Sequence, residues 1–216
     1  MKSSDKISST LEESILRGDY KNGHRLNEVD LSHQFNVSRT PIREALQKLT
    51  KSGLVEQIHG RGVFVRQPSA NELFELFELM AELESACGRL AAMRISESAL
   101  NQLQQANENC KVAMLADEAD NYYYANRVFH SVIYRESGNS ALEKETMRVH
   151  QRLKPYRRLQ LKVRGRMSQS MSEHQEIVNA LRHADSEKAA QLLRGHVAIQ
   201  GEKFRYLLSS FEEVQA

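Results

Sequence analysis

The segment spanning residues 35–49, FNVSRTPIREALQKL, restricts the possible folds of this chain more than any other stretch. Four apolar residues recur at the spacing of a single helix face: Ile42, Ala45, Leu46 and Leu49. Four polar residues occupy the other face: Arg39, Thr40, Arg43 and Gln47. Ser38 is a suitable N-cap, Pro41 is tolerated in the first turn, and Gly53 can end the helix. The pattern predicts a short helix with a buried back and two arginines near its N-terminus.

The flanking segments assign this helix to a larger motif. Residues 4–17 are predicted as a first helix, followed by a loop from Gly18 to Arg25 and a short amphipathic segment at 26–35, capped by Asn27. Two segments after the central helix alternate like strands, with a turn at His59–Gly62 between them: residues 54–58 and 62–66. An ordinary amphipathic helix with two solvated arginines is the alternative, but the flanks favour a winged helix-turn-helix, whose second helix enters the DNA major groove.

The stretch from Asn22 to Val65, above all VSRTPIREAL, SGL and RGVFV, resembles the DNA-binding domain of the GntR family of bacterial transcription regulators. The resemblance covers about residues 10–66. We expect the start of the recognition helix to contact the major groove through Ser38, Arg39, Thr40 and Arg43. We expect the wing tip to reach the backbone or the minor groove through Arg61 and Gly62. Two such readers on a two-fold axis imply a homodimer and a pseudo-palindromic operator.

Length and charge agree with two domains. A chain of 216 residues can hold two cores, and its net charge of +2 excludes a global polycation. Residues 1–68 carry 11 basic and 8 acidic residues, a net charge of +3, whereas the remainder carries 19 and 20. The sign suits nucleic-acid binding at the N-terminus. We place the domain boundary at Pro68. Residues 1–68 then form the DNA-binding domain, called the reader below, and residues 69–216 form a second domain.

The chain shows no sign of export or membrane insertion. Cys87 and Cys110 are the only cysteines and form no metal motif, which fits a reduced cytoplasm. No apolar run approaches the ~18–20 residues of a membrane span, and the N-terminus has no signal-peptide core. We therefore expect a cytoplasmic protein with no membrane partner.

The second domain is predicted to be an all-α bundle, so the fold class is mainly α. An apolar stripe from Leu73 to Ala91 marks its first helix. Five further helical segments follow, near residues 97–116, 119–137, 140–163, 168–184 and 186–210. A reader followed by a helical bundle resembles the FadR-like branch of the GntR family, whose FCD domain senses a ligand and dimerises. Six helices fit its shorter, VanR-like type.

Three histidines lie at apolar-stripe positions of three predicted helices, namely His130, His174 and His196. Each is too polar for a buried site unless it is paired or coordinated. For any one of them, a core histidine with a hydrogen-bond partner is the simpler interpretation. For three on helices that can pack together, a metal site is favoured, because histidine is the commonest metal ligand and bundles frame such sites.

The family resemblance extends this interpretation. In metal-binding FCD domains the ligands are three histidines and an Asp or Asn one turn before the first, which here implies Asn126, His130, His174 and His196. In this chain Asn126 takes the place of the usual acidic ligand. Zinc, nickel, manganese and iron are therefore all candidate ions. Three imidazoles and an amide leave a +2 charge uncompensated and two positions open, which a carboxylate effector would fit. Glu173 precedes His174 directly and is expected on another side of the helix, so no HExxH base is present.

A basic run at residues 148–166 contains eight Lys and Arg residues and no acid. A solvated helix face is the favoured interpretation, and a second DNA surface is the least favoured. Arg152 and Arg157 are candidates to point inward and bind an anionic effector. The family resemblance places an effector-binding arginine on the first bundle helix, where this chain has Met80.

Together these patterns predict a ligand-responsive transcription regulator, a repressor, whose carboxylate effector binds at a metal site. One alternative is a metal sensor in which the ion itself is the signal. A second is a metal-dependent hydrolase or oxygenase fused to a DNA-binding domain, although the sequence shows no evident general base. A third is an architectural DNA-binding protein with a structural dimerisation domain.

Overall fold

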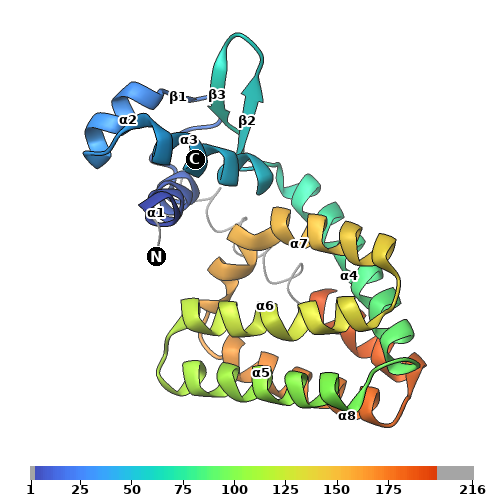
Figure 1. Cartoon of the computed structure of the whole chain (residues 1–216). Coiled ribbons are helices and arrows are strands. Elements are labelled where there is room, and N and C mark those ends of the chain that lie inside the picture. Colours follow the sequence, from blue (N-terminus) through green and yellow to red (C-terminus); the bar gives the residue numbers. More distant parts are fainter. Residues whose placement is uncertain (1–2, 199–216) are drawn as a thin grey trace. The chain divides into compact units, whose positions relative to one another are not determined.

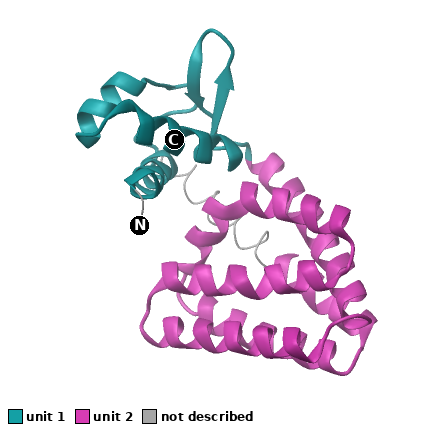
Figure 2. Cartoon of the chain, viewed as in Figure 1, with its two compact units in different colours: residues 1–69 teal, residues 70–216 magenta. Residues whose placement is uncertain are grey.

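The structure, a computed structural model, describes residues 3–198 of the chain. The chain divides after Ser69 into two compact units, one residue beyond the predicted boundary (Figure 2). The first is a winged helix-turn-helix and the second is all-helical, which confirms the predicted fold class (Figure 1).

The N-terminal unit contains three helices and a small sheet. Its elements are α1 (Ser3–Arg17), β1 (Arg25–Leu26), α2 (Glu28–Phe35), α3 (Arg39–Lys51), β2 (Val55–Ile58) and β3 (Gly62–Val65). The strands are antiparallel in the order β1-β3-β2, so the wing strand β3 lies in the centre. The prediction that the loop from Gly18 extends to Arg25 was wrong at Arg25. This residue pairs with Phe64 and belongs to a third strand, β1. Buried apolar residues of α1 and α3, which pack against each other, form much of the core of this unit.

One side-chain cap and two residues with positive φ mark the boundaries of α2 and α3. The Asn27 side chain accepts a hydrogen bond from Val29 N at 2.8 Å, as predicted for an N-cap. Ser38 occupies the N-cap position of α3, but its side chain makes no capping hydrogen bond there. Asn36, with φ 51°, turns the chain between the helices, and Gly53, with φ 72°, follows the end of α3.

The C-terminal unit is a helical bundle. Its named helices are α4 (Ala70–Ala92), α5 (Glu97–Leu115), α6 (Ala119–Glu136), α7 (Ser140–Leu161) and α8 (Arg166–Arg182). Residues 186–198 are helical as well, and the rest of the segment predicted to reach residue 210 lies outside the described residues. Helix α6 packs against α4, α5 and α7, and it lies between α5 and α7 in Figure 1. Side chains that point inward from α6 therefore meet several helices.

Close packing fixes the helix at residues 186–198 against α4. A Cβ atom built on Gly88 would lie 2.2 Å from Leu193 Cδ1 and 3.3 Å from the Ala189 backbone oxygen. A side chain at this position would therefore displace the Leu193 side chain and crowd the Ala189 backbone. Gly88 allows the close approach that brings His196 toward the bundle interior, where it is 2% exposed.

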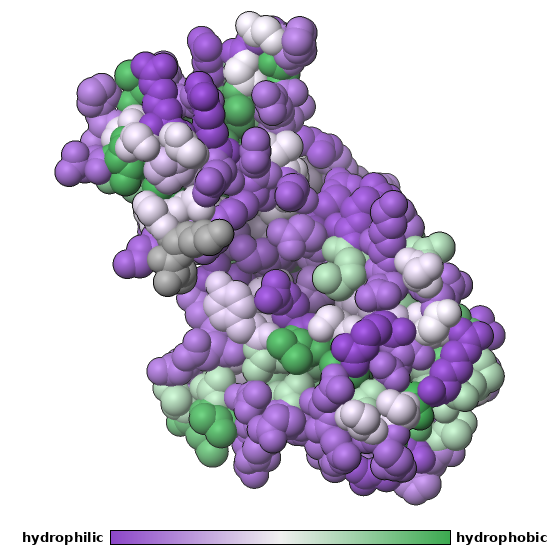
Figure 3. Space-filling model, in the orientation of Figure 1, coloured by the Kyte–Doolittle hydropathy of each residue, from purple (hydrophilic) through white to green (hydrophobic). Residues whose placement is uncertain are grey.

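The surface of the described region is mostly polar, with apolar side chains in small groups on the face shown in Figure 3.

The basic run at residues 148–166 differs from the solvated helix face that was predicted for it. Three of its arginines are buried: Arg157, Arg158 and Arg166. Each has an acidic partner within 3.1 Å, which offsets the cost of burying its charge. No helix in residues 3–198 is long and apolar enough to cross a membrane.

Both cysteine thiols are expected to be unreactive toward alkylating reagents in the folded protein. Burial raises the pKa of Cys87 to about 11 and that of Cys110 to about 12. At pH 8 the thiolate, which is the reactive form, is then a fraction on the order of 10⁻³ or less. We expect negligible iodoacetamide labelling of the native chain over an hour and complete labelling in guanidinium chloride, measured by mass spectrometry. Rapid labelling of the native chain would contradict the buried placement.

Candidate functional site

The side chains predicted to contact DNA at the start of α3 are exposed to solvent. The four predicted major-groove residues are all exposed: Ser38, Arg39, Thr40 and Arg43. Arg61 is exposed at the wing tip, with its guanidinium 5.6 Å from the Phe64 ring, and Gly62 opens β3 with φ 112°. The buried face of α3 consists of Ile42, Ala45, Leu46 and Leu49, as its periodicity predicted. The helix therefore exposes its polar face.

An acidic residue of α2 orients one of these arginines. Arg43 Nε donates to Glu28 Oε2 at 2.8 Å, and the Glu28 side chain is one third exposed. This bond uses one edge of the guanidinium, whose remaining donors can bind a guanine or a phosphate. Glu28 was not predicted from the sequence, because its partner Arg43 lies 15 residues away.

The three predicted histidines meet in the core of the bundle. His130 comes from α6, His174 from α8 and His196 from the helix at 186–198, and each is at most 2% exposed. One ring nitrogen from each lies within 4.8 Å of the other two. Among the His, Cys, Asp and Glu side chains of the described residues, these three histidines form the one group close enough together to share a metal ion.

The outer nitrogens of these rings face acceptors. His130 Nδ1 lies 2.7 Å from Glu84 Oε2, and His196 Nδ1 lies 2.6 Å from Glu173 Oε2. His174 Nδ1 lies 3.3 Å from Asn107 Oδ1 on α5. Acceptors at Nδ1 favour the tautomer whose Nε2 lone pair is free, which is the arrangement of metal-ligating histidines. All three rings are therefore held so that Nε2 can serve as the ligand atom.

Burial keeps these imidazoles neutral at physiological pH. It lowers the pKa of His174 well below its usual value and that of His196 to about 4, and it lowers the pKa of His130 against the opposing effect of Glu84. A neutral imidazole is the form that binds a metal ion. The site needs no deprotonation to accept one.

Asn126 is the fourth side chain of the predicted ligand set. It lies one helical turn before His130 on α6 and is 4% exposed. Its Oδ1 atom is buried and has no hydrogen-bond partner among residues 3–198. A buried unpaired oxygen costs free energy, so its presence beside three ligand-type nitrogens fits a divalent ion. The side chains present therefore suit the ion that the histidines indicate.

A buried carboxylate, Glu84 of α4, links the histidines to α7. It is fully buried and accepts hydrogen bonds from Tyr134 Oη at 2.7 Å and from Arg157 Nη1 at 3.0 Å. Burial by itself would raise the pKa of Glu84, but the adjacent His130 side chain and the Arg157 guanidinium hold that pKa well below its usual range. His150 completes the group, with Nδ1 at 3.1 Å from Tyr134 Oη. The network connects α4, α6 and α7.

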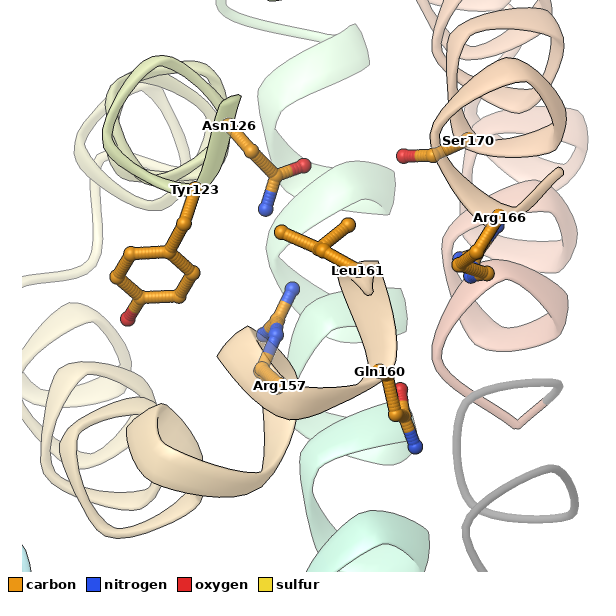
Figure 4. Close-up of a pocket in the computed structure, with 7 residues that line it drawn as sticks. All are labelled: Tyr123, Asn126, Arg157, Gln160, Leu161, Arg166 and Ser170. Carbon is orange, nitrogen blue, oxygen red and sulfur yellow. The ribbon is translucent and has the colours of Figure 1, made fainter. Parts of the chain in front are cut away.

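A small cavity lies next to the histidine cluster, because two of its lining residues, Arg157 and Ser170, approach His130 Nε2 and His174 Nε2. Figure 4 shows the side chains that line it. It is lined by Tyr123, Asn126, Arg157, Gln160, Leu161, Arg166 and Ser170. In Figure 4, Asn126 and Ser170 reach toward each other across the space between α6 and α8. The free volume of the cavity is about 10 Å³, which admits one water-sized group. Two of the lining residues, Arg157 and Arg166, are buried arginines.

Of the two arginines predicted to bind the effector, the structure places only one at the cavity. Arg157 lines the cavity, whereas Arg152 is half-buried and does not belong to the lining. Met80, at the position of the family's arginine, is fully buried. Glu173 was expected on another side of the helix from His174, and in the structure its carboxylate contacts His196 and Arg166. Several side chains of the site were not predicted from the sequence: Glu84, Asn107, His150, Arg166 and Ser170.

A winged helix-turn-helix joined to a helical bundle defines a two-domain DNA-binding protein. The family model for "Bacterial regulatory proteins, gntR family" matches residues 3–65, and the model for the FCD domain matches residues 75–198. The chain therefore belongs to the GntR family, with an FCD domain, and it is a DNA-binding transcription regulator of that type.

Curated relatives and solved structures agree with this assignment. The chain is 30% identical over 182 residues to the Nta operon transcriptional regulator of Aminobacter aminovorans, covering 82% of this chain and 83% of the relative. It is 28% identical over 193 residues to a probable D-xylose utilization operon transcriptional repressor of Paenarthrobacter nicotinovorans, covering 85% and 80%. The E. coli protein McbR/YncC shares the fold with a TM-score of 0.72 at 21% identity, covering 97% of this chain and 99% of that chain.

Proposed function

We propose that the protein is a cytoplasmic, homodimeric repressor whose operator affinity is controlled by a small carboxylate bound at a divalent metal ion in the FCD domain. The observation that carries the proposal is the convergence of three neutral histidines beside the unpaired Asn126 oxygen, in a chain that also holds a DNA reader. One relative is described as a repressor, which agrees with the proposed direction of control.

Four side chains would hold the ion: Asn126, His130, His174 and His196. Nitrogen and neutral oxygen donors suit zinc, nickel, manganese or iron. When bound, the ion supplies positive charge that attracts a carboxylate. Glu84, Asn107 and Glu173 orient the imidazole rings, and Arg157 lies close enough to contact the same ligand, with Nη2 3.5 Å from His130 Nε2. Arg152 is the weaker candidate, because it does not line the cavity.

Helix α4 provides the covalent connection from this site to the reader. Only residues 66–69 separate the end of β3 from the start of α4, and Glu84 of α4 contacts both His130 and Arg157. A ligand that repositions His130 or Arg157 therefore acts on a residue of α4. In a homodimer this would alter the spacing of two readers, with a coupling on the order of 1–3 kcal/mol.

A second candidate function is a metal sensor in which the ion is the signal. The observation that favours it is the size of the cavity, because a free volume of about 10 Å³ admits little beyond one water-sized group. The two functions differ in one measurement. A sensor changes its operator affinity when zinc alone is added, whereas the proposed effector site needs zinc and a small carboxylate together.

Replacement of Arg43 by alanine is expected to weaken specific DNA binding. An arginine that binds guanine contributes ~1–3 kcal/mol of discrimination, so the operator Kd should rise about 5- to 150-fold. The measurement is fluorescence anisotropy with an operator selected from random duplexes by the wild-type protein. The control is Arg17→Ala, which removes an exposed cation from α1 of the same unit. Unchanged operator affinity of Arg43→Ala would contradict the assignment of α3 as the recognition helix.

A further inference from the structure

The charges around the cavity set a requirement on its ligand. Four side chains in or next to it are charged at neutral pH, and they form two ion pairs. Arg157 Nη1 lies 3.0 Å from Glu84 Oε1, and Arg166 Nη1 lies 3.1 Å from Glu173 Oε2. A histidine that binds a metal ion does so as the neutral imidazole, so the three histidines add no charge and the side chains of the site sum to zero. The protein therefore has no spare negative charge to offset a metal ion here.

A divalent ion at the histidines would leave an excess of two positive charges. Asn126 is neutral, whereas an aspartate at this position would reduce the excess to one. Burying an uncompensated charge is costly, and a bound cation is then the largest local charge of its site. One carboxylate ligand would remove half of the excess. A ligand with two negative charges would remove all of it.

The two arginines are placed to receive the second charge. Both are almost fully buried, with exposures of 3% for Arg157 and 2% for Arg166, and both line the same cavity. They come from different helices, α7 and α8, and the Ser170 hydroxyl lies on the same wall as Arg166 (Figure 4). Guanidinium groups suit carboxylate and phosphate oxygens because their donors form a planar fork. Arg157 also approaches His130 Nε2 to 3.5 Å, so one short ligand can reach both.

We propose that the effector is a short dianion, with one anionic group at the metal-ligating histidines and the other between Arg157 and Arg166. This inference rests on the proposed function, because it requires an ion at the histidines. The ligand is short because the cavity is small, with room for about one water-sized group before side chains shift. A small dicarboxylate and a phosphate share this chemistry, and the experiment separates them.

The experiment is isothermal titration calorimetry on the full chain saturated with zinc. The probes are two monoanions, acetate and propionate, and four dianions, malonate, succinate, sulfate and phosphate at pH 8. We expect at least one dianion to bind with a Kd tenfold or more below that of both monoanions. Preference for malonate or succinate identifies a dicarboxylate site, and preference for phosphate or sulfate identifies an oxyanion site. Equal Kd values for monoanions and dianions, or no binding of any probe, would overturn the inference.

Two variants test the charge argument itself. Asn126→Asp adds one negative charge, so the preference for dianions over monoanions should fall about tenfold or more. Arg166→Gln removes one positive charge and should lower the preference in the same direction. Arg164→Gln is the matched control, because Arg164 is exposed and lies two residues earlier in the chain. An unchanged preference in Asn126→Asp would contradict the proposal even if Arg166→Gln failed to fold.

Zinc content measured before and after each titration separates the two levels of failure. If the wild-type chain takes up no zinc, the proposed metal site is wrong and the dianion proposal falls with it. If zinc stays at one ion per chain but dianions gain no preference, the metal site stands and the dianion proposal alone is wrong. A loss of zinc during titration with malonate would show that the probe removes the ion rather than binding to it, which also counts against the proposal.

Discussion

Removal of divalent metal from the wild-type protein is expected to lower its melting temperature by about 10 °C, and zinc is expected to restore it. A ligand at 1,000 times its Kd stabilises the folded state by about 4 kcal/mol. In a domain of this size each kcal/mol shifts the melting temperature by roughly 2–4 °C. The measurement is circular dichroism melting after dialysis against a chelator, followed by titration with zinc at fixed protein concentration.

The double variant His174→Ala, His196→Ala should not respond to zinc. These histidines come from two helices of the bundle, and their replacement removes two of the four proposed donors. The matched control is His183→Ala, because His183 is exposed at the end of α8, away from the cluster. A double variant that still gains the full zinc-dependent shift would place the ion elsewhere on the chain.

Replacement of Glu84 by alanine is expected to destabilise the helical domain by about 3–5 kcal/mol, even without metal. The change leaves the Arg157 guanidinium buried without its carboxylate partner, and breaking a buried pair from one side typically costs this much. It also removes the acceptors of Tyr134 and His130. Thermal and urea melts followed by circular dichroism measure the loss.

A second substitution and a surface control make this result specific. The double variant Glu84→Met, Arg157→Met removes both charges and should recover much of the loss, because an apolar pair of similar volume needs no charge compensation. Glu82→Ala, two residues earlier on α4, breaks only the exposed pair with Arg194, which is worth ~0–1 kcal/mol. If Glu84→Ala were as mild as Glu82→Ala, the buried network would not hold the bundle together.

The reader was predictable because its signals are local. The stripe from Ile42 to Leu49 indicates both the buried back of α3 and its exposed arginines. The Asn27 cap and the turn at His59–Gly62 follow from chemistry within a few residues of each other. Strand β1 was missed because two residues show no alternation, and Arg25 becomes a strand only by pairing with Phe64.

The histidines of the helical domain were also accessible from the sequence, because each occupies an apolar-stripe position of its own helix. Their partners were not, because those contacts depend on how helices pack. Glu173 is adjacent to His174 in sequence but contacts His196, 23 residues away. Glu84 did leave a signal, since it falls between Met80 and Cys87 on the buried face of α4. A carboxylate at such a position needs buried cationic partners, and Arg157 of the basic run is one of them.

X-ray absorption at the zinc edge of the zinc-loaded full chain tests the central claim, that three histidines of the helical domain hold a metal ion. We predict one ion per chain with three imidazole nitrogens at about 2.0–2.1 Å and further oxygen ligands, since Asn126 offers one. In Asn126→Ala the three imidazoles should remain while the oxygen contribution changes. A spectrum with sulfur at about 2.3 Å, or with fewer than three imidazoles, would contradict the assignment of the ion to His130, His174 and His196.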